Sequence, residues 1–180
     1  MKAAGKYLFH EEQSFRQNRL MLLVFAAVLP AIIFPVYGMY QQLYLGKPWG
    51  DNPTSDGALI ITSVVTIVIV LLVALLMLNL KLITEVRTEG FYYRFPILIN
   101  SLKEIRKDEI SHCEVGKYHP IREFGGWGIR FRPGRGRAYN VKGNEGVKLF
   151  LKNGKMVLFG TQQPYEMKRA IDKMMNHSNL

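Results

Sequence analysis

The sequence predicts a membrane-anchored α+β protein, in which a helical hairpin precedes a β-rich domain that ends in a helix. Two long segments, residues 20–46 and 57–80, contain no charged residue and no histidine. Residues 81–180 carry 19 of the 24 Lys and Arg residues but 10 of the 14 Asp and Glu residues. This part also divides into short apolar runs separated by turn residues, which is typical of strands. We therefore predict an N-terminal arm at 1–19, a hairpin at 20–82 and a basic domain at 83–180.

The second apolar segment is the clearer membrane span. Residues 57–80 are dominated by Leu, Ile and Val. A helix of this length covers roughly 36 Å, which exceeds the thickness of the bilayer hydrocarbon core, about 30 Å. The β-branched residues favour a strand in water, but a lone strand in lipid leaves its backbone groups unpaired. We predict a transmembrane helix at about 58–80.

The first apolar segment predicts a transmembrane helix at about 20–40, followed by an outer loop at 41–57. Pro30 and Pro35 each remove a backbone donor and tend to bend a helix. A kinked span packed against the second helix is the preferred interpretation, and a re-entrant or interfacial segment is the alternative. A cleaved signal peptide does not fit, because the apolar core of a signal peptide is only about 7–15 residues long and this apolar segment is longer.

Basic residues near the spans predict the orientation of the hairpin. The outer loop contains a single basic residue, Lys47. The segments that flank the hairpin contain six: Lys2, Lys6, Arg16, Arg19, Lys81 and Arg87. Because positive residues stay inside, both termini are expected in the cytoplasm, as in an integral protein of the cytoplasmic membrane. The single cysteine, Cys113, is then expected to stay reduced. For the arm, both an interfacial helix and an extended lead-in remain open.

The β-rich domain is predicted to contain seven strands, at residues 82–87, 91–95, 109–117, 127–132, 137–142, 147–152 and 155–159. Trp127, Ile129 and Phe131 alternate with polar residues and are expected to face the core. Asn153-Gly154 predicts a type I′ turn between the last two strands. Residues 161–175 are predicted to form a helix, because apolar residues recur there at helical spacing: Met167, Ala170, Ile171, Met174 and Met175.

Four segments carry a resemblance to a known family: residues 11–16, 118–130, 138–141 and 158–164. They are similar to segments of an uncharacterised family of bacterial membrane proteins with a pleckstrin-homology-like (PH-like) domain, and the similarity extends over nearly the whole chain. The resemblance implies two transmembrane helices followed by a PH-like β-barrel or sandwich of seven strands with a C-terminal helix. It also implies a location in the bacterial inner membrane. It implies no activity.

A cluster of basic residues is the candidate site for a lipid or a protein partner. Arg130, Arg132, Arg135 and Arg137 surround a predicted hairpin tip, and Lys142 follows them. Alternate residues of a strand share a face, so Arg130 and Arg132 are expected on one side of the sheet. Such a patch can bind phosphate oxygens or anionic headgroups. The alternative is a solvated strand surface that discourages edge pairing.

Phosphoinositide recognition of the eukaryotic type is not expected. Eukaryotic PH domains that bind these lipids tend to use basic residues around the loop between their first two strands. The matching connection here, residues 87–91, is short and contains Glu89. General attraction to an anionic membrane remains, at roughly 1 kcal/mol for each well-placed Lys or Arg.

No set of residues predicts catalysis, a metal site or a cofactor. His112, Cys113 and His119 are the only conceivable ligands or nucleophile, but adjacent strand residues such as His112 and Cys113 point to opposite faces. Cys113 is therefore expected to be a small core residue. Neither span contains an ionisable residue, which disfavours transport.

The function expected from the sequence is a non-enzymatic, membrane-anchored binding module that docks a protein partner, an anionic lipid or a second copy of the chain. The alternative is an assembly or accessory subunit of a membrane complex that acts mainly through its helices. An enzyme acting on lipid substrates is a third, weaker alternative. Nucleic-acid binding is not expected.

Overall fold

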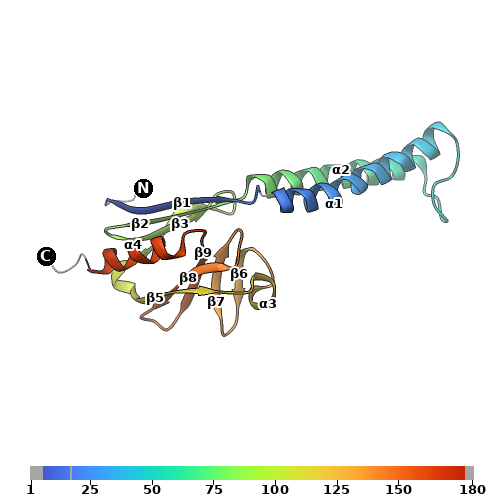
Figure 1. Ribbon diagram of the computed structural model, residues 1–180. Coiled ribbons are helices and arrows are strands. Elements are labelled where there is room, and N and C mark those ends of the chain that lie inside the picture. Colours follow the sequence, from blue (N-terminus) through green and yellow to red (C-terminus); the bar gives the residue numbers. More distant parts are fainter. Residues whose placement is uncertain (1–5, 17, 177–180) are drawn as a thin grey trace. The chain divides into compact units, whose positions relative to one another are not determined.

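Figure 1 shows the computed structural model, which describes residues 6–16 and 18–176 and, for residues 18–21, the backbone alone. The chain forms two compact units. One combines Met1–Phe15 with Leu80–Leu180 and is called the β-rich unit, and the other, Arg16–Asn79, is called the helical unit. In sequence, the helical unit is therefore an insertion into the β-rich unit. Most of the predicted N-terminal arm belongs to the β-rich unit.

The helical unit contains two long apolar helices, as the sequence predicts. The first is α1 (Asn18–Met39), which continues as the π-helical turn η1 (Tyr40–Tyr44), and the second is α2 (Asp56–Asn79). Pro30 and Pro35 lie inside α1, which is one continuous helix. By length and composition, both helices are able to cross a membrane. Only 6% and 11% of their apolar windows are buried within the chain.

The first sheet of the β-rich unit brings the N-terminal arm together with the chain that follows the helices. Its order is β1 (Tyr7–Ser14), β2 (Lys81–Arg87), β3 (Gly90–Phe95) and β4 (Ile99–Arg106), and all neighbours are antiparallel. The pairing of β1 with β2 runs from Tyr7 opposite Arg87 to Ser14 opposite Lys81. Of the two conformations left open for the arm, its described residues before α1 adopt the extended one.

The second sheet has five strands in the order β5-β8-β9-β7-β6. Their bounds are β5 (Ile110–Lys117), β6 (Gly128–Arg132), β7 (Gly136–Asn140), β8 (Glu145–Leu151) and β9 (Met156–Gly160). All pairs are antiparallel except β7 with β9. Three helices complete the unit: η2 (Lys107–Glu109), α3 (Pro120–Phe124) and α4 (Pro164–Asn176).

The described part of the chain has nine strands, two more than the sequence predicts. The additional strands are β1 and β4. The buried positions of β1 are Phe9, Glu11 and Gln13, so polar side chains interrupt the apolar alternation. β4 is an edge strand whose one buried side chain is Ile105. Neither strand therefore shows the alternation that identifies a half-buried strand.

The main core of the β-rich unit combines aromatic rings of both sheets with one face of α4. The ring centroids of Phe91 and Phe159 are 4.5 Å apart, and Tyr139 stacks on Phe159 at 5.2 Å. Helix α4 contacts β1 and β2 of the first sheet and β5 and β8 of the second (Figure 1). Its buried apolar side chains follow the predicted helical spacing: Met167, Ala170, Ile171 and Met174.

The prediction that Trp127, Ile129 and Phe131 all face the core is wrong. Trp127 precedes β6 and is 37% exposed, and Phe131 is 69% exposed. Ile129 is half-buried. Because β6 is the edge strand of its sheet, apolar alternation along it does not correspond to a buried face.

The predicted β8–β9 hairpin is present, but its turn is not of type I′. That turn needs positive φ at both central residues, whereas Gly154 has a φ of +78° and Asn153 does not have a positive φ. The Gly154 N–H donates to the Leu151 carbonyl, and the Leu151 N–H donates to the Lys155 carbonyl, both at 2.9 Å. This is the three-residue hairpin loop that ends in a glycine bulge.

Candidate functional site

The β6–β7 hairpin, called the arginine hairpin, places its arginines on two faces of the second sheet. Arg130 lies opposite Ala138, and Arg132 shares its face because the two are alternate residues of one strand, as predicted. Arg137 lies opposite Phe131 and belongs to the other face. These three arginines therefore do not form one continuous patch.

Two of the arginines hold the hairpin tip against α3. The Nη1 atom of Arg132 donates to the carbonyl oxygens of Arg122 at 2.5 Å and Glu123 at 3.0 Å. Arg135 forms an ion pair with the Glu123 carboxylate at 2.7 Å. Carbonyl groups at a helix C-terminus favour a positive charge, which explains the position of Arg132. Both side chains thus have a structural role.

The other members of the predicted set have fewer partners within the protein. The Nε atom of Arg130 donates to the Trp127 carbonyl at 3.0 Å. Arg137 is exposed, and its side chain forms no hydrogen bond or ion pair with the described residues. Lys142 follows β7 and is half-buried, with its carbonyl accepting from Gln162 at 3.5 Å. Arg130 and Arg137 are therefore the members most available to a ligand.

Arg132→Ala is expected to lower the free energy of unfolding by about 1 kcal/mol, because two charge-assisted hydrogen bonds to α3 are lost from an exposed position. Arg137→Ala breaks no such bond and is the matched control, with an expected change below about 0.5 kcal/mol. Urea unfolding of the full chain in mild detergent, followed by near-ultraviolet circular dichroism, measures both variants. Equal losses would contradict the structural role of Arg132.

A buried polar network joins β1 to the loop between β9 and α4. The Glu11 carboxylate, 7% exposed, accepts hydrogen bonds from the Thr161 hydroxyl at 2.6 Å and the Gln162 backbone N–H at 2.9 Å. The Gln13 side-chain amide donates to Glu11 at 3.1 Å and to the Gly160 carbonyl at 2.7 Å. The network ties β1 of the first sheet to β9 of the second sheet.

Gly160 lies where this network meets two further buried polar side chains. A Cβ atom at this position would lie 2.7 Å from the Tyr118 hydroxyl and 2.8 Å from the Asn140 Cβ, so only glycine fits. Burial raises the pKa of Tyr118 to about 12, so its hydroxyl keeps its proton at neutral pH. Each of the four segments that carry the family resemblance contributes a residue to this region.

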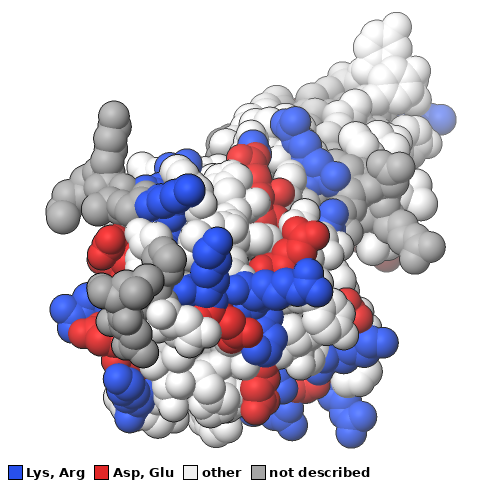
Figure 2. All heavy atoms as spheres, turned by 60° about the vertical axis from the view of Figure 1, so that its left-hand side comes forward, with Lys and Arg blue, Asp and Glu red and all other residues white. Residues whose placement is uncertain are grey.

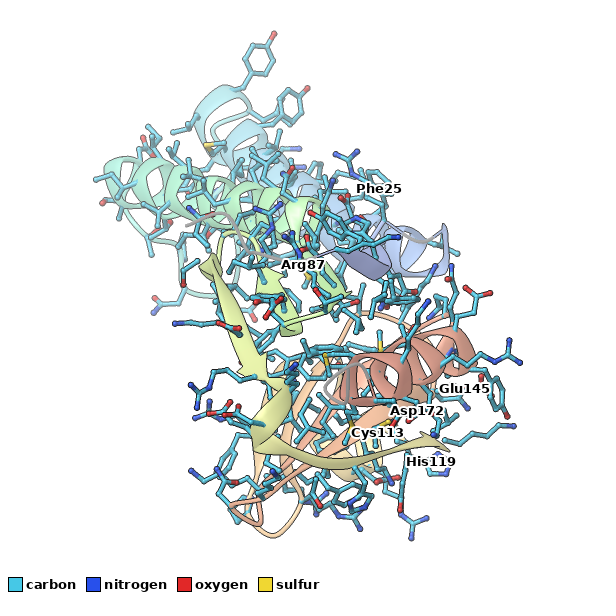
Figure 3. The ribbon with its side chains drawn as sticks, turned by 90° about the vertical axis from the view of Figure 1, so that its left-hand side faces the viewer. Phe25, Arg87, Cys113, His119, Glu145 and Asp172 are labelled. Carbon is cyan, nitrogen blue, oxygen red and sulfur yellow. The ribbon has the colours of Figure 1, made fainter. Side chains whose placement is uncertain are left out.

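Cys113 points from β5 toward α4. Its Sγ lies 3.5 Å from one Asp172 oxygen, and the other accepts a hydrogen bond from Lys168 at 2.6 Å (Figure 3). Burial, and then the negative charge of Asp172, raise the pKa of the Cys113 thiol to about 11. A protonated thiol is a poor nucleophile. The neighbouring His112 is exposed and stacks on Phe150, so the two adjacent side chains point to opposite faces, as predicted.

The stability of the β-rich unit is expected to fall between about pH 9 and pH 11. Because the pKa of Cys113 is raised from 9.0, the folded state holds a proton that the unfolded state releases. This contribution is complete below pH 9 and is lost as the pH rises through the folded pKa. Cys113→Ala removes the thiol and is expected to flatten the decline. Urea unfolding across this pH range measures both chains, and parallel profiles would contradict the assignment.

No group of three or more His, Cys, Asp or Glu side chains that suits a metal ion occurs within residues 6–16 and 18–176. His119 is exposed and precedes α3, where its backbone N–H donates to the Glu123 carboxylate at 2.9 Å. This backbone hydrogen bond to Glu123 explains the position of His119 beside α3.

The outer face of the first sheet holds an ion pair between aromatic rings. Arg87 contacts Glu85 at 2.5 Å, and the two side chains are only 8% and 9% exposed. The guanidinium carbon of Arg87 lies 4.0 Å from the ring centroid of Tyr7 and 5.5 Å from that of Tyr92. The charge of Arg87 (labelled in Figure 3) is thus satisfied inside the protein.

Two basic residues, the half-buried Lys81 and the exposed Arg94, lie at the end of the first sheet where the chain passes into the helices. Lys81 begins β2 and pairs with Glu12 at 2.6 Å. Arg94 lies on the same face of the sheet as Lys81. Ile83 shares that face with Lys81 as an alternate residue of β2, and it pairs with Glu12 in β1 and with Arg94 in β3. The hydrogen bond from Lys81, and more weakly the charge of Arg94, lower the pKa of Glu12. Lys81 and Arg94 are called the basic end of the first sheet.

Charge is otherwise dispersed over the β-rich unit. Figure 2 shows acidic and basic side chains intermixed on the visible face of this unit. The formal net charge of the chain is +10, but it does not gather into one basic field on that face. A binding site must therefore be sought in local groups of residues.

The helical unit has an apolar groove of about 300 Å³ between α1 and α2. Phe34, Pro35 and the loop residue Trp49 line one side, and Thr62 and Thr66 line the other. Trp49 is seated in edge-to-face contact with Phe34, with ring centroids 5.2 Å apart.

A comparison with protein-family models assigns the chain to a family. A model described as a family of unknown function (DUF6141) matches residues 2–177. The chain belongs to this family. The match covers β1, both helices and α4, so the helical insertion lies within the region that the DUF6141 model describes. No match to a curated protein was found.

The sequence did not predict the Glu11 network or the basic end of the first sheet. The signal for the network was present in β1, where Glu11 and Gln13 occupy the same alternating positions as Phe9. The basic end gave no local signal, because Lys81 and Arg94 lie on different strands and meet only through pairing in the sheet.

Proposed function

We propose that the chain is a non-enzymatic, membrane-anchored binding module whose β-rich unit docks anionic lipid headgroups at the surface of the bilayer that α1 and α2 span. The observation that carries this proposal is the shortness of the connections. α2 ends at Asn79 and β2 begins at Lys81, while β1 ends at Ser14 and α1 begins at Asn18. At 3.8 Å per residue, Lys81 lies within about 8 Å of the last residue of α2. Two chain segments thus hold the same end of the first sheet at the bilayer surface.

The charges near the helices support a cytoplasmic position for the β-rich unit. Arg16 precedes α1 and Lys81 follows α2, whereas the loop between the helices contains Lys47 as its only basic residue. Positive residues stay on the cytoplasmic side, where the leaflet is anionic. In a bacterium this is the inner membrane. Lys81 and Arg94 then face a surface of opposite charge.

The topology supports the PH-like interpretation of the β-rich unit. The arginine hairpin extends one side of the second sheet, where β7 pairs in parallel with β9. Without β6 and β7, seven strands and the C-terminal helix α4 remain, which is the inventory of a PH-like domain. In this interpretation the membrane hairpin is inserted between the first two strands of the domain.

The proposal is tested by titrating the full chain, in a neutral detergent, with short-chain phosphatidylglycerol or phosphatidylcholine at low and high salt. Tighter, salt-sensitive binding of the anionic lipid is expected. Changing Lys81 and Arg94 together to Gln is expected to weaken this binding roughly 30-fold, since each well-placed cation contributes about 1 kcal/mol and about 1.4 kcal/mol corresponds to a tenfold change. The matched control changes Arg130 and Arg137 to Gln, with the same change in net charge.

Each outcome of this titration is informative. A larger loss in the Arg130 and Arg137 variant would place the site on the arginine hairpin, as the sequence predicts. Equal affinity for both lipids at low salt would contradict lipid docking. It would favour a protein partner at the β6 edge, where Phe131 is exposed beside the arginines.

A second candidate function is an accessory subunit that acts through its helices. The observation that favours it is the apolar groove between α1 and α2. Replacing both helices with an unrelated hairpin would then abolish recovery of the partner complex while the β-rich unit stays folded. Unchanged recovery would exclude this role.

A further inference from the structure

The turn between β3 and β4 exposes two large apolar side chains on a strained backbone. The Leu98 N–H donates to the Phe95 carbonyl at 3.0 Å and closes a four-residue turn around Pro96 and Ile97. Ile97 has a φ of +79° and is the one non-glycine residue with positive φ in the described part of the chain. The side chains of Ile97 and Leu98 are 55% and 52% exposed.

The fold of the β-rich unit does not explain an isoleucine at this position. Proline followed by a residue of positive φ is the type II turn pattern, in which glycine or asparagine is preferred. A β-branched residue with positive φ is a genuine outlier, and such strain clusters at functional positions. Because half of the Ile97 side chain faces outward, burial in the core compensates for only part of this strain.

The location of the turn indicates what contacts it. Lys81 pairs with Ser14, and β3 runs antiparallel to β2, so β3 ends where β1 and β2 join the helices. The ring of Phe95 lies 6.3 Å from that of Phe15, and the Phe15 N–H donates to the Leu80 carbonyl at 3.2 Å. Neighbouring strands are about 4.8 Å apart, so the turn lies within roughly 10 Å of both connections.

We propose that the turn formed by Pro96, Ile97 and Leu98, called the apolar turn, inserts into the headgroup–acyl boundary of the bilayer as a third contact beside the two helices. This inference rests on the proposed membrane anchoring. The short connections hold this end of the sheet at the bilayer surface, and Ile97 and Leu98 are the side chains that an apolar boundary stabilises. The flanking basic end, Lys81 and Arg94, fits the anionic headgroups above that boundary.

The test uses the full chain in vesicles of phosphatidylcholine and phosphatidylglycerol, with Cys113→Ala as background and one nitroxide label. Labels at Leu98→Cys, Glu89→Cys and Leu72→Cys are compared by their accessibility to oxygen and to a water-soluble nickel complex. Glu89 is the matched control, because the β2–β3 turn lies at the opposite end of the same sheet. Leu72 is exposed within α2 and reports the anchoring itself. The oxygen-to-nickel ratio is expected to be at least about threefold higher at position 98 than at 89.

The outcomes separate this inference from the proposed anchoring. A lipid-like ratio at 72 with a water-like ratio at 98 overturns the insertion of the turn and leaves the anchoring intact. A water-like ratio at 72 overturns both. Low accessibility of position 98 to both reagents means that protein covers the turn, which also overturns the proposal. If Leu98→Cys does not fold, Ile97→Cys carries the same label.

Ile97→Gly distinguishes membrane insertion from a merely strained turn. Glycine adopts the observed backbone without strain and removes the apolar side chain. The variant is expected to raise the urea midpoint of the β-rich unit while lowering the oxygen-to-nickel ratio at Leu98→Cys toward that at Glu89→Cys. An unchanged ratio at position 98 would contradict a role for Ile97 in insertion.

Discussion

Residues 80–180 produced alone are expected to remain unfolded, whereas the same residues joined behind residues 1–15 are expected to fold as a water-soluble protein. The reason is that β1 completes the first sheet and buries Phe9 and Phe15. Without β1, β2 becomes an open edge strand, although all six residues that follow Lys81 in β2 are buried in the complete unit. Small domains are typically stable by only about 5–15 kcal/mol, so the loss of a whole strand with two buried phenylalanines is expected to unfold the unit.

The geometry at the junction makes the joined protein practicable. The Phe15 N–H and the Leu80 carbonyl are 3.2 Å apart, so a Gly/Ser linker of about four residues is able to replace residues 16–79. Far-ultraviolet circular dichroism and amide chemical-shift dispersion distinguish a folded from an unfolded chain. A joined chain with Phe9→Ser and Phe15→Ser is the control and is expected to unfold. Native-like dispersion of residues 80–180 alone would contradict the role of β1.

Glu11→Ala is expected to destabilise the β-rich unit by roughly 3 kcal/mol, because buried donors lose their acceptor. The Thr161 hydroxyl and the Gln162 N–H donate to this carboxylate, and both would be left unsatisfied. Glu12 is the matched control in the same strand. Its ion pair with Lys81 is exposed, with 45% and 43% of the two side chains accessible. Glu12→Ala is expected to cost less than about 1 kcal/mol.

Urea unfolding of the full chain in mild detergent measures the two variants in parallel. Glu11→Gln refines the comparison, because it keeps the size of the side chain but replaces one acceptor oxygen with a donor group. An intermediate loss is expected for it. Equal effects at positions 11 and 12 would mean that the network around Glu11 does not hold β1 in place.

The sequence predicts the parts of the fold whose signals are local. The uncharged stretch of 57–80 predicts α2, and the apolar spacing from Met167 to Met174 predicts α4. Asn153-Gly154 correctly indicates the β8–β9 hairpin, although the turn type depends on the φ of Asn153, which the dipeptide alone does not determine. These elements form from interactions between residues close in sequence.

The sequence does not reveal that β1 and β2 pair across the helical insertion. Glu11 and Thr161 are separated by 150 positions, and their hydrogen bond exists only in the folded unit. Polar residues at the buried positions of β1 remove the apolar alternation that would mark a strand. The basic pattern around residues 130–137 likewise predicts a hairpin, but tertiary contacts with α3 decide which arginines have structural partners.

We propose that the β-rich unit itself recognises an anionic membrane surface. The most direct test is co-sedimentation of the joined protein, residues 1–15 linked to 80–180, with vesicles of phosphatidylcholine alone or with phosphatidylglycerol added. We expect binding to the anionic vesicles that falls about 10-fold or more between low and high salt, with little binding to neutral vesicles. A joined protein that is folded but does not bind anionic vesicles at low salt would contradict it.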